Sequence, residues 1–159
     1  MPKRSAGLLV YRRVEGEPEV LLVHPGGPYW AKKDEGAWSL PKGEYEPDED
    51  PLDVAIREFE EELGIEPPET KEPTFLGEVR QPGGKLVSAW AVEGEVDVND
   101  VRSNTFTMEW PPRSGRTAEF PEVDRAGWFD LETARRKLLR GQLGLLDRFA
   151  ELLEAGSDR

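Results

Sequence analysis

Residues 43–65 read GEYEPDEDPLDVAIREFEEELGI and contain the clearest helix signal of the chain. Asp50 is a preferred N-cap residue, and Pro51 suits the first position of a helix. Gly64 can adopt the left-handed conformation that commonly ends a helix. The sequence therefore predicts a helix over residues 51–63, followed by a glycine stop.

This predicted helix has two chemically different faces. At about 100° per residue, its apolar side chains share one face, while Glu58, Glu61 and Glu62 lie together on roughly the opposite side. The apolar side chains are those of Leu52, Ala55, Ile56, Phe59 and Leu63. Carboxylates three and four residues apart repel one another by roughly a few tenths of a kcal/mol per pair, and the helix has few cations to offset this.

The acidic face has two interpretations when the helix is considered alone. It can be a solvated surface, or it can be the binding site of a cation. The chain has no cysteine, so any metal must be held mainly by oxygen, which Mg²⁺ and Mn²⁺ prefer. Three glutamates on adjacent turns beside a loop carbonyl would form such a site, and a bound ion would remove the repulsion.

The same stretch resembles the Nudix box, G-x5-E-x7-R-E-U-x-E-E-x-G-U, in which U is a bulky apolar residue. Every specified place is filled, by Gly43, Glu49, Arg57, Glu58, Phe59, Glu61, Glu62, Gly64 and Ile65. A chance match anywhere in a chain of this composition is on the order of 10⁻⁵. The predicted order of strands around the box also resembles the family, so we favour the cation site over the solvated surface.

The resemblance implies a fold and a chemistry. Nudix proteins have an α/β fold, an α/β/α sandwich with a central mixed β-sheet, in which the box holds Mg²⁺ or Mn²⁺. They hydrolyse a pyrophosphate bond in a nucleoside diphosphate linked to another group, such as an NTP or a dinucleoside polyphosphate. This reaction needs neutralised phosphate charge, an aligned water and a carboxylate that accepts a proton, which a metal and glutamates supply.

The resemblance also implies roles for the acidic residues. Glu58 and Glu62 would be the main metal ligands, and Glu61 would bind a second ion or activate the water. The backbone carbonyl of Lys42, which precedes the box glycine, would join the metal shell. Many family members take a further glutamate from a loop before a Trp-containing strand, and spacing favours Glu122 for that role.

Two more acids and three other box residues complete the implied site. Glu119 and Glu109 are the alternatives to Glu122, and each of these acids can equally be an exposed surface residue. Arg57 would orient Glu49 or a neighbouring glutamate by a charge-assisted hydrogen bond. Gly43 would let the loop backbone turn close to the metal.

Cations outside the box are candidates for binding an anionic substrate. The lead-in Leu40–Gly43 resembles that of family members acting on dinucleoside polyphosphates or diphosphoinositol phosphates, so the Lys42 side chain can contact a phosphate. Arg113 and Arg116 in the loop PPRSGRT are two more candidates, and Lys32 and Lys33 lie in another Gly/Pro loop. Ordinary solvated loop charges are the alternative for all of them.

The aromatic residues divide into core and loop positions. Trp38, Trp30 and Trp110 lie near loops and are candidates for stacking on a base, with Trp38 included in our predicted substrate site. Trp90 and Trp128 lie on strand-like runs and are expected in the core. The single histidine, His24, ends a strand and is expected to be structural, and the insert 24–38 is expected to shape the substrate pocket.

The rest of the chain predicts short strands around the central helix and two helices after them. The expected strands are Ser5–Tyr11, Glu19–His24, Thr74–Gln81, Lys85–Val92, Asn104–Trp110 and Arg125–Phe129, with a brief extended piece at residues 38–40. The expected helices are Leu131–Arg140 and Leu143–Leu153, and loops are expected at 65–73, 93–103 and 111–122. This pattern predicts one layered α/β domain over residues 1–159.

Composition narrows the function classes. The formal net charge of −12 disfavours nonspecific binding of duplex nucleic acid or of anionic membranes. No apolar stretch approaches the roughly 20 residues of a membrane span, and the start of the chain does not fit a signal peptide, so a cytoplasmic location is expected. A catalytically inactive Nudix-fold sensor of nucleotide or RNA, and a plain ion-binding scaffold, are the two alternatives to an enzyme.

Overall fold

The computed structural model describes residues 3–69 and 72–157. Its strands are β1 (Arg4–Val14), β2 (Glu17–Pro25), β3 (Lys42–Tyr45), β4 (Thr74–Arg80), β5 (Leu86–Glu93), β6 (Thr105–Glu109), β7 (Thr117–Pro121) and β8 (Val123–Asp130). Its helices are α1 (Pro51–Leu63), α2 (Leu131–Lys137) and α3 (Leu143–Ser157), with short 3-10 helices η1 (Val98–Asp100) and η2 (Arg140–Gln142).

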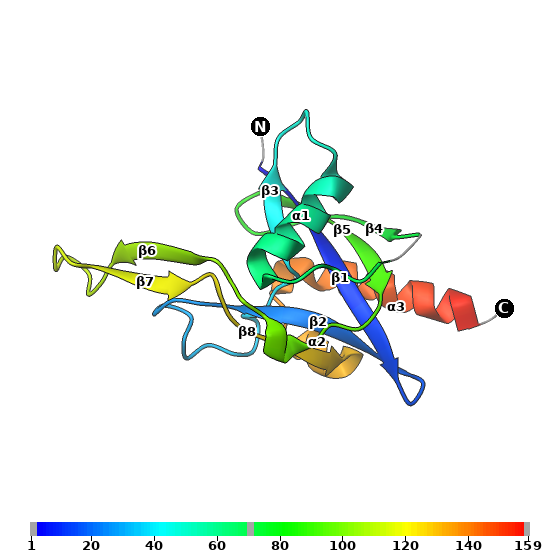
Figure 1. Ribbon diagram of the computed structural model, residues 1–159. Coiled ribbons are helices and arrows are strands. Elements are labelled where there is room, and N and C mark those ends of the chain that lie inside the picture. The colour runs from blue at the N-terminus through cyan, green and yellow to red at the C-terminus, as the bar shows by residue number, and fades with distance from the viewer. Residues whose placement is uncertain (1–2, 70–71, 158–159) are drawn as a thin grey trace.

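The central sheet has the order β4-β5-β1-β2-β8, and β3 also pairs with β1. Strands β1 and β5 are parallel, whereas β1 pairs antiparallel with both β2 and β3, so the sheet is mixed as predicted. Strand β1 pairs with β3 through residues 4–7 and with β2 through residues 11–14. Strands β6 and β7 form a separate hairpin that projects from the body of the domain (Figure 1).

Helices cover both faces of the sheet and enclose two cores. Alternate residues of β1 point to opposite sides, so Leu9 packs in the core with Leu145 and Phe149 of α3, while Leu8 packs in the core with Phe59 of α1. Helix α2 lies on the same side as α3 and contacts β2 and β8. This three-layer arrangement confirms the predicted α/β/α sandwich.

The predicted central helix and both of its ends are confirmed. The carboxylate of Asp50 accepts a hydrogen bond from the backbone N–H of Asp53 at 3.3 Å. Gly64 has a φ of 69° and its N–H donates to the carbonyl of Glu60 at 2.8 Å, which ends the helix. The apolar face is buried at Ala55, Phe59 and Leu63, but Ile56 is exposed.

One prediction about the connections was wrong. Residues 117–121 were expected in a loop, but they form β7, which pairs antiparallel with β6 in a hairpin. Residues 42–45, which were not among the expected strands, form β3, because the edge of β1 offers unpaired backbone groups there. Of the connection expected at 65–73, residues 70 and 71 lie outside the described residues.

The helix expected at 131–140 is shorter than predicted. It ends at Lys137, and Leu138 has an extended backbone with φ −72° and ψ 144°. This break lets Leu138 form a parallel bridge with Trp38 in the extended piece that leads to the box. Within the part of the chain that the structure describes, no helix is long and apolar enough to cross a membrane.

A buried glutamine connects the C-terminal part of the chain to the segment before β3. The side-chain oxygen of Gln142 accepts from the backbone N–H of Leu40 at 3.0 Å. Its side-chain nitrogen donates to the hydroxyl of Ser39 and to the side-chain oxygen of Gln81, both at 3.0 Å. Because Gln142 is fully buried, these bonds fix the approach of the chain to Lys42.

We expect Gln142→Leu to destabilise the protein by about 2 kcal/mol, because the buried N–H of Leu40 loses its partner. Urea unfolding followed by circular dichroism measures this change. Gln81→Leu is the matched control, because it removes only the hydrogen bond between Gln142 and the half-buried Gln81. It should lower the free energy of unfolding by less than Gln142→Leu does. Equal losses for the two variants would contradict the role assigned to Leu40.

Candidate functional site

The carboxyl group of Glu58 lies against the backbone of β3. A Cβ atom built on Gly43 would lie 2.2 Å from the carboxyl carbon of Glu58, which is far inside contact distance. The sequence suggested that Gly43 is needed for a turn, but Gly43 is not among the described residues with positive φ. Its role is therefore to leave space for the Glu58 carboxylate.

Glu62 lies one turn further along α1 and is more deeply buried. One of its carboxylate oxygens accepts a hydrogen bond from the backbone N–H of Lys42 at 2.9 Å. Burial raises the pKa of Glu62 to about 7, and the charges of Glu122 and Glu58 add to this effect, while Lys42 opposes it. Without a bound cation, Glu62 is thus poised between its protonated and ionised forms near neutral pH.

Glu122 joins these glutamates from the chain just before β8. Its backbone N–H donates to the carbonyl of Asn104 at 2.8 Å, and its carbonyl accepts from the N–H of Gly26 at 2.9 Å. Its charge raises the pKa of both Glu58 and Glu62. The structure therefore brings Glu122, the acid favoured by spacing, to the glutamates of α1.

The two alternative acids lie elsewhere. Glu109 ends β6 and Glu119 lies in β7, both at exposed positions of the projecting hairpin. Neither is among the charges that shift the pKa of Glu58 or Glu62.

Arg57 partly neutralises the acidic face. Its guanidinium lies 3.1 Å from a carboxylate oxygen of Glu49, 3.8 Å from Glu58 and 4.0 Å from the half-exposed Glu61. Burial and the charge of Glu61 raise the pKa of Glu58, and Arg57 opposes this. The sequence predicted that Arg57 orients Glu49 or a neighbouring glutamate, and the structure shows this arginine near three carboxylates.

Lys42, Glu62 and Glu122 line one cavity of about 220 Å³ together with Trp30. Burial lowers the pKa of Lys42, the nearby Lys85 lowers it further, and Glu62 opposes them. The structure thus places Lys42, the lysine selected from the sequence, on the lining of the cavity with Glu62 and Glu122.

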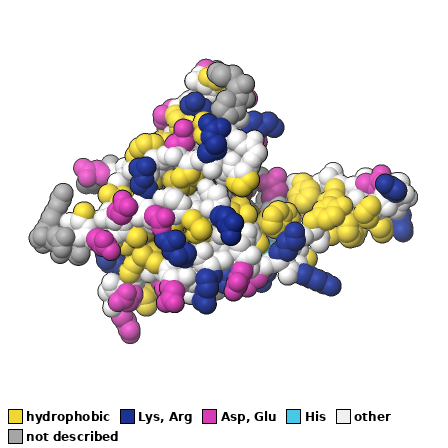
Figure 2. All heavy atoms as spheres, turned by 180° about the vertical axis from the view of Figure 1, so that it is seen from behind, with side chains coloured by type: hydrophobic (Ala, Val, Ile, Leu, Met, Phe, Trp, Pro, Cys, Tyr) yellow, Lys and Arg dark blue, Asp and Glu magenta, His cyan; other side chains and the backbone are white. Residues whose placement is uncertain are grey.

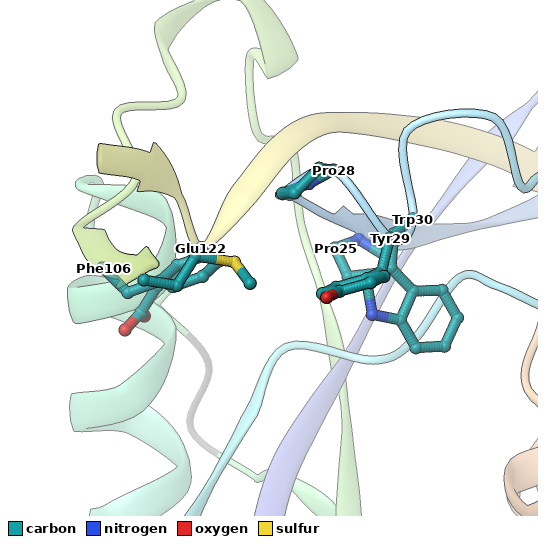
Figure 3. Close-up of a pocket in the computed structure, with 9 residues that line it drawn as sticks. Pro25, Pro28, Tyr29, Trp30, Phe106 and Glu122 are labelled. Atoms are coloured by element: carbon teal, nitrogen blue, oxygen red, sulfur yellow. The ribbon is translucent and has the colours of Figure 1, made fainter. Parts of the chain in front are cut away.

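A second cavity of about 420 Å³ adjoins the first, and Pro25, Trp30 and Glu122 line both. Tyr29 and Trp30 form one wall, and Phe106 and Glu122 form the other, with open space between them (Figure 3). Tyr29 and Phe106 were not among the residues predicted from the sequence. Two features of the sequence could have indicated them. One is the aromatic pair in the insert 24–38, and the other is the apolar residues at alternate positions of β6.

Trp38 corrects one prediction. It is only 5% exposed and packs edge-on against Phe129, with ring centroids 4.9 Å apart, while its indole N–H donates to Asp34 at 2.8 Å. The residues that flank Trp38 in the sequence suggested a position near a loop. The β-bridge between Trp38 and Leu138 places it in the core instead. Trp38 is therefore a core residue and not a base-stacking residue.

The arginines of the predicted loop also lie away from the glutamates. Arg113 and Arg116 lie in the turn between β6 and β7, at the tip of the projecting hairpin (Figure 1). Neither contributes to the pKa shift of Glu58 or Glu62. The hairpin, which the sequence did not predict, carries them outward.

His24 is structural, as expected. It is fully buried, its Nδ1 lies 2.8 Å from a carboxylate oxygen of Asp124, and its Nε2 lies 2.6 Å from the carbonyl of Lys33. It thereby connects the end of β2 to β8 and to the insert.

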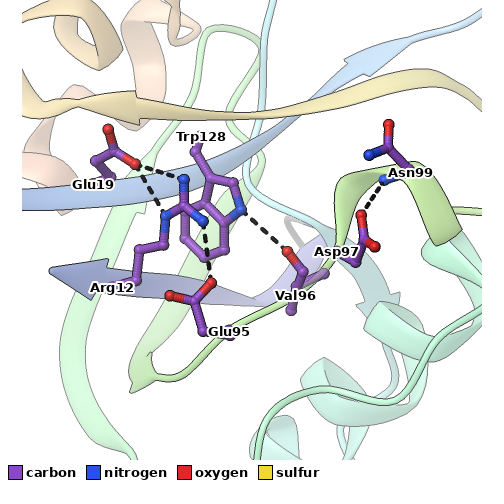
Figure 4. A network of polar contacts seen from close by, with 7 residues as sticks. All are labelled: Arg12, Glu19, Glu95, Val96, Asp97, Asn99 and Trp128. Atoms are coloured by element: carbon purple, nitrogen blue, oxygen red, sulfur yellow. Dashed lines mark hydrogen bonds and ion pairs between the residues drawn. The ribbon is translucent and has the colours of Figure 1, made fainter. Parts of the chain in front are cut away.

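Trp128 is also structural. The Arg12 guanidinium lies 4.3 Å from its ring centroid, and its indole N–H donates to the carbonyl of Val96 at 3.1 Å. Figure 4 shows Arg12 between Trp128 and the carboxylates of Glu19 and Glu95.

The donor set of the site fits a hard divalent cation in its chemistry. The candidate ligands are carboxylate oxygens of Glu58, Glu61, Glu62 and Glu122 and the carbonyl of Lys42, and Mg²⁺ and Mn²⁺ prefer such ligands. Across residues 3–69 and 72–157, no group of three acidic or histidine side chains is already arranged to hold a metal ion. Burial and neighbouring carboxylates raise the pKa of both Glu58 and Glu62, and a bound cation would oppose this effect.

Two relatives are similar to this chain in sequence. An asymmetrical bis(5'-nucleosyl)-tetraphosphatase from Caenorhabditis elegans is 37% identical over 78 residues, which cover 49% of each chain. An RNA pyrophosphohydrolase from Bartonella henselae is 30% identical over 149 residues, covering 82% of this chain and 78% of the relative. The chain thus spans about half the length of the first relative.

Solved structures show the same fold. The C. elegans Ap4A hydrolase, in a binary complex, has a TM-score of 0.64 at 25% identity, covering 96% of this chain and 98% of that one. The NUDIX domain of Shewanella oneidensis NrtR, complexed with ADP ribose, has a TM-score of 0.63 at 17% identity, covering 96% and 89%. The second likeness concerns the fold alone.

The family model described as NUDIX domain matches residues 1–149. The chain therefore belongs to the NUDIX domain family, which confirms the resemblance drawn from residues 43–65.

We expect Gly43→Ala to fold normally but to lower the affinity for Mn²⁺ by roughly tenfold to a hundredfold, because the new methyl group displaces the flexible Glu58 side chain. Glu58→Gln should have a similar effect, and the double variant should be no worse than either single variant. Titration calorimetry with Mn²⁺ measures the affinities. Wild-type Mn²⁺ binding by Gly43→Ala would contradict the assignment.

The raised pKa of Glu62 predicts a pH-dependent stability of the metal-free protein. The folded protein binds this proton more tightly than the unfolded chain, whose carboxyl has a pKa of 4.5, so the stabilising contribution is full at low pH and is lost as the pH rises through about 7. Glu62→Gln removes that loss. In EDTA it should melt roughly a few degrees above wild type at about pH 8, with the difference shrinking toward about pH 5.

Thermal unfolding of Glu60→Gln is the matched control for this stability test, because Glu60 is exposed on the same helix. A difference between Glu62→Gln and wild type that stays constant with pH would show that Glu62 does not carry the effect.

Proposed function

We propose that this chain is a Mg²⁺- or Mn²⁺-dependent pyrophosphohydrolase that cleaves a phosphoanhydride bond in a small substrate containing a nucleotide. The observation that carries the proposal is that Glu62 and Glu122 line one cavity with Lys42, and that Glu58 lies close enough for the charge of Glu122 to raise its pKa. An ordinary acidic surface would place these carboxylates in solvent, apart from one another. Here they come from two distant parts of the chain, and Glu58 and Glu62 are partly buried.

Glu58, Glu62 and the carbonyl of Lys42 would hold the metal, and Glu61 would hold a second ion or accept a proton. When bound, such an ion neutralises phosphate charge and lowers the pKa of a coordinated water. Glu122 faces the same cavity and is the second candidate to accept the proton of the attacking water. Arg57 holds Glu49, Glu58 and Glu61 in place and is a positioning residue.

The ammonium group of Lys42 would contact a phosphate of the substrate. Lys42 lines the cavity with Glu62 and Glu122, and a cation beside it offsets phosphate charge where the glutamates would otherwise repel it. A nucleotide-containing substrate is supported by the relatives, a bis(5'-nucleosyl)-tetraphosphatase and an RNA pyrophosphohydrolase. We retain one domain over residues 1–159 and a cytoplasmic location as parts of this proposal.

We expect Glu62→Gln and Glu61→Gln to lower kcat by roughly a hundredfold or more, because each loses a metal ligand or a proton acceptor. Glu60→Gln, an exposed acid on the same helix, should retain wild-type activity. The assay incubates each protein with Mg²⁺ or Mn²⁺ and NTPs, dinucleoside polyphosphates, nucleotide sugars or diphosphoinositol phosphates, and identifies the products by mass. EDTA should abolish turnover.

Full activity in Glu61→Gln and Glu62→Gln would refute the assigned roles. Tight nucleotide binding with no turnover in either metal would instead identify a Nudix-fold sensor module.

A further inference from the structure

The larger cavity beside the glutamates has the shape and chemistry of a base-binding pocket. We propose that Tyr29, Trp30, Phe106 and Met108 bind the nucleobase of the substrate by stacking and apolar contact, with little readout of its hydrogen-bonding edge. This inference rests on the proposed function, because it assumes that the phosphates lie beside Lys42. It assigns the insert 24–38 and the β6–β7 hairpin a shared role in binding.

The position of the pocket supports a base. Pro25, Trp30 and Glu122 line both this pocket and the smaller cavity that contains Lys42 and Glu62. A nucleotide whose phosphates contact Lys42 would therefore extend its sugar and base into the larger space. Its volume of about 420 Å³ lies within the usual range of small-molecule sites.

The lining favours stacking over edge recognition. Apart from Glu122, only the hydroxyl of Tyr29 and the indole N–H of Trp30 are polar side-chain groups on the lining. Every base has a π face that stacks on an aromatic ring, and such stacking tolerates changes of base. Removing the base from a ligand should therefore lower its affinity for the pocket more than exchanging one base for another.

Close backbone packing builds the pocket. A Cβ atom on Gly26 would lie 1.9 Å from the carbonyl oxygen of Pro121, and one on Gly27 would lie 3.0 Å from the ring of Phe106. Gly27 also has a φ of 99°, which other residues rarely adopt. The two glycines thus let the insert approach the hairpin, and the two walls of the pocket are set by the backbone.

Further contacts hold the two walls together. The ring centroids of Tyr29 and Trp110 lie 5.5 Å apart at nearly right angles. The backbone N–H of Gly26 donates to the carbonyl of Glu122 at 2.9 Å, so the apolar pocket and the acidic cavity are fixed relative to one another.

Apolar side chains gather along the projecting hairpin (Figure 2), and an exposed patch of this kind can also bind a second copy of the chain. The concave shape between two walls and the continuity with the acidic cavity favour a base. The experiment below separates the two occupants.

The test compares binding of AMP with binding of ribose 5-phosphate, which lacks the base, by titration calorimetry in Mg²⁺. Wild type should bind AMP roughly tenfold or more tightly than ribose 5-phosphate. Tyr29→Ala and Phe106→Ala should weaken AMP binding by roughly tenfold and leave ribose 5-phosphate binding unchanged. The affinities for AMP, GMP, CMP and UMP should agree within roughly tenfold.

Phe75→Ala is the matched control, because Phe75 is exposed on β4 and does not line either cavity. Tyr29 is 58% exposed, so Tyr29→Ala keeps the test informative even where Phe106→Ala unfolds. The activities of the Glu61 and Glu62 variants test the proposed function. Binding of AMP requires no turnover, so it tests this pocket separately.

Equal affinities of wild type for AMP and ribose 5-phosphate would overturn the inference. So would unchanged AMP binding by Tyr29→Ala, or strong selectivity for one base over the other three. A change from dimer to monomer in Phe106→Ala by light scattering, with AMP binding intact, would assign the hairpin to self-association instead.

Discussion

The contact between α1 and β3 is the constraint on which the rest of the site depends. Glu58 occupies the space that a side chain at residue 43 would fill, and Glu62 accepts a hydrogen bond from the N–H of Lys42. Both contacts need the helix to lie within one side-chain length of the strand. Strand β1 makes this possible, because its first residues pair with β3 while Leu8 packs against the core beneath α1.

The site combines a rigid part with a more variable one. The carboxylates lie on a helix whose two ends are capped and whose apolar face is buried, so their positions are set by regular structure. The larger pocket is made by a Gly/Pro insert and a hairpin outside the main sheet, neither of which contributes to the two cores apart from residues at their edges. Trp30 of the insert and Glu122 line both cavities, so a change in the walls of the larger pocket also acts on the cavity that Glu62 lines.

The sequence predicted best where local physics and tertiary structure agree. The helix with its Asp50 cap and Gly64 stop was predictable, because the signals lie within fifteen residues and nothing distant opposes them. Strand β7 and the core position of Trp38 were not, because both depend on partners far along the chain, β6 for the first and Leu138 for the second. For the same reason, spacing favoured Glu122 but could not exclude Glu119 or Glu109, which the unpredicted hairpin carries away.

The buried amide of Gln142 has a consequence for how the molecule is made. It satisfies the backbone N–H of Leu40, a residue 102 positions earlier in the chain. Because synthesis runs from the N-terminus, residues 40–65 leave the ribosome before Gln142, and the N–H of Leu40 cannot donate to this side chain until residue 142 has been added. The segment entering β3 therefore gains its buried partner only after the candidate acids Glu58, Glu62 and Glu122 have been synthesised.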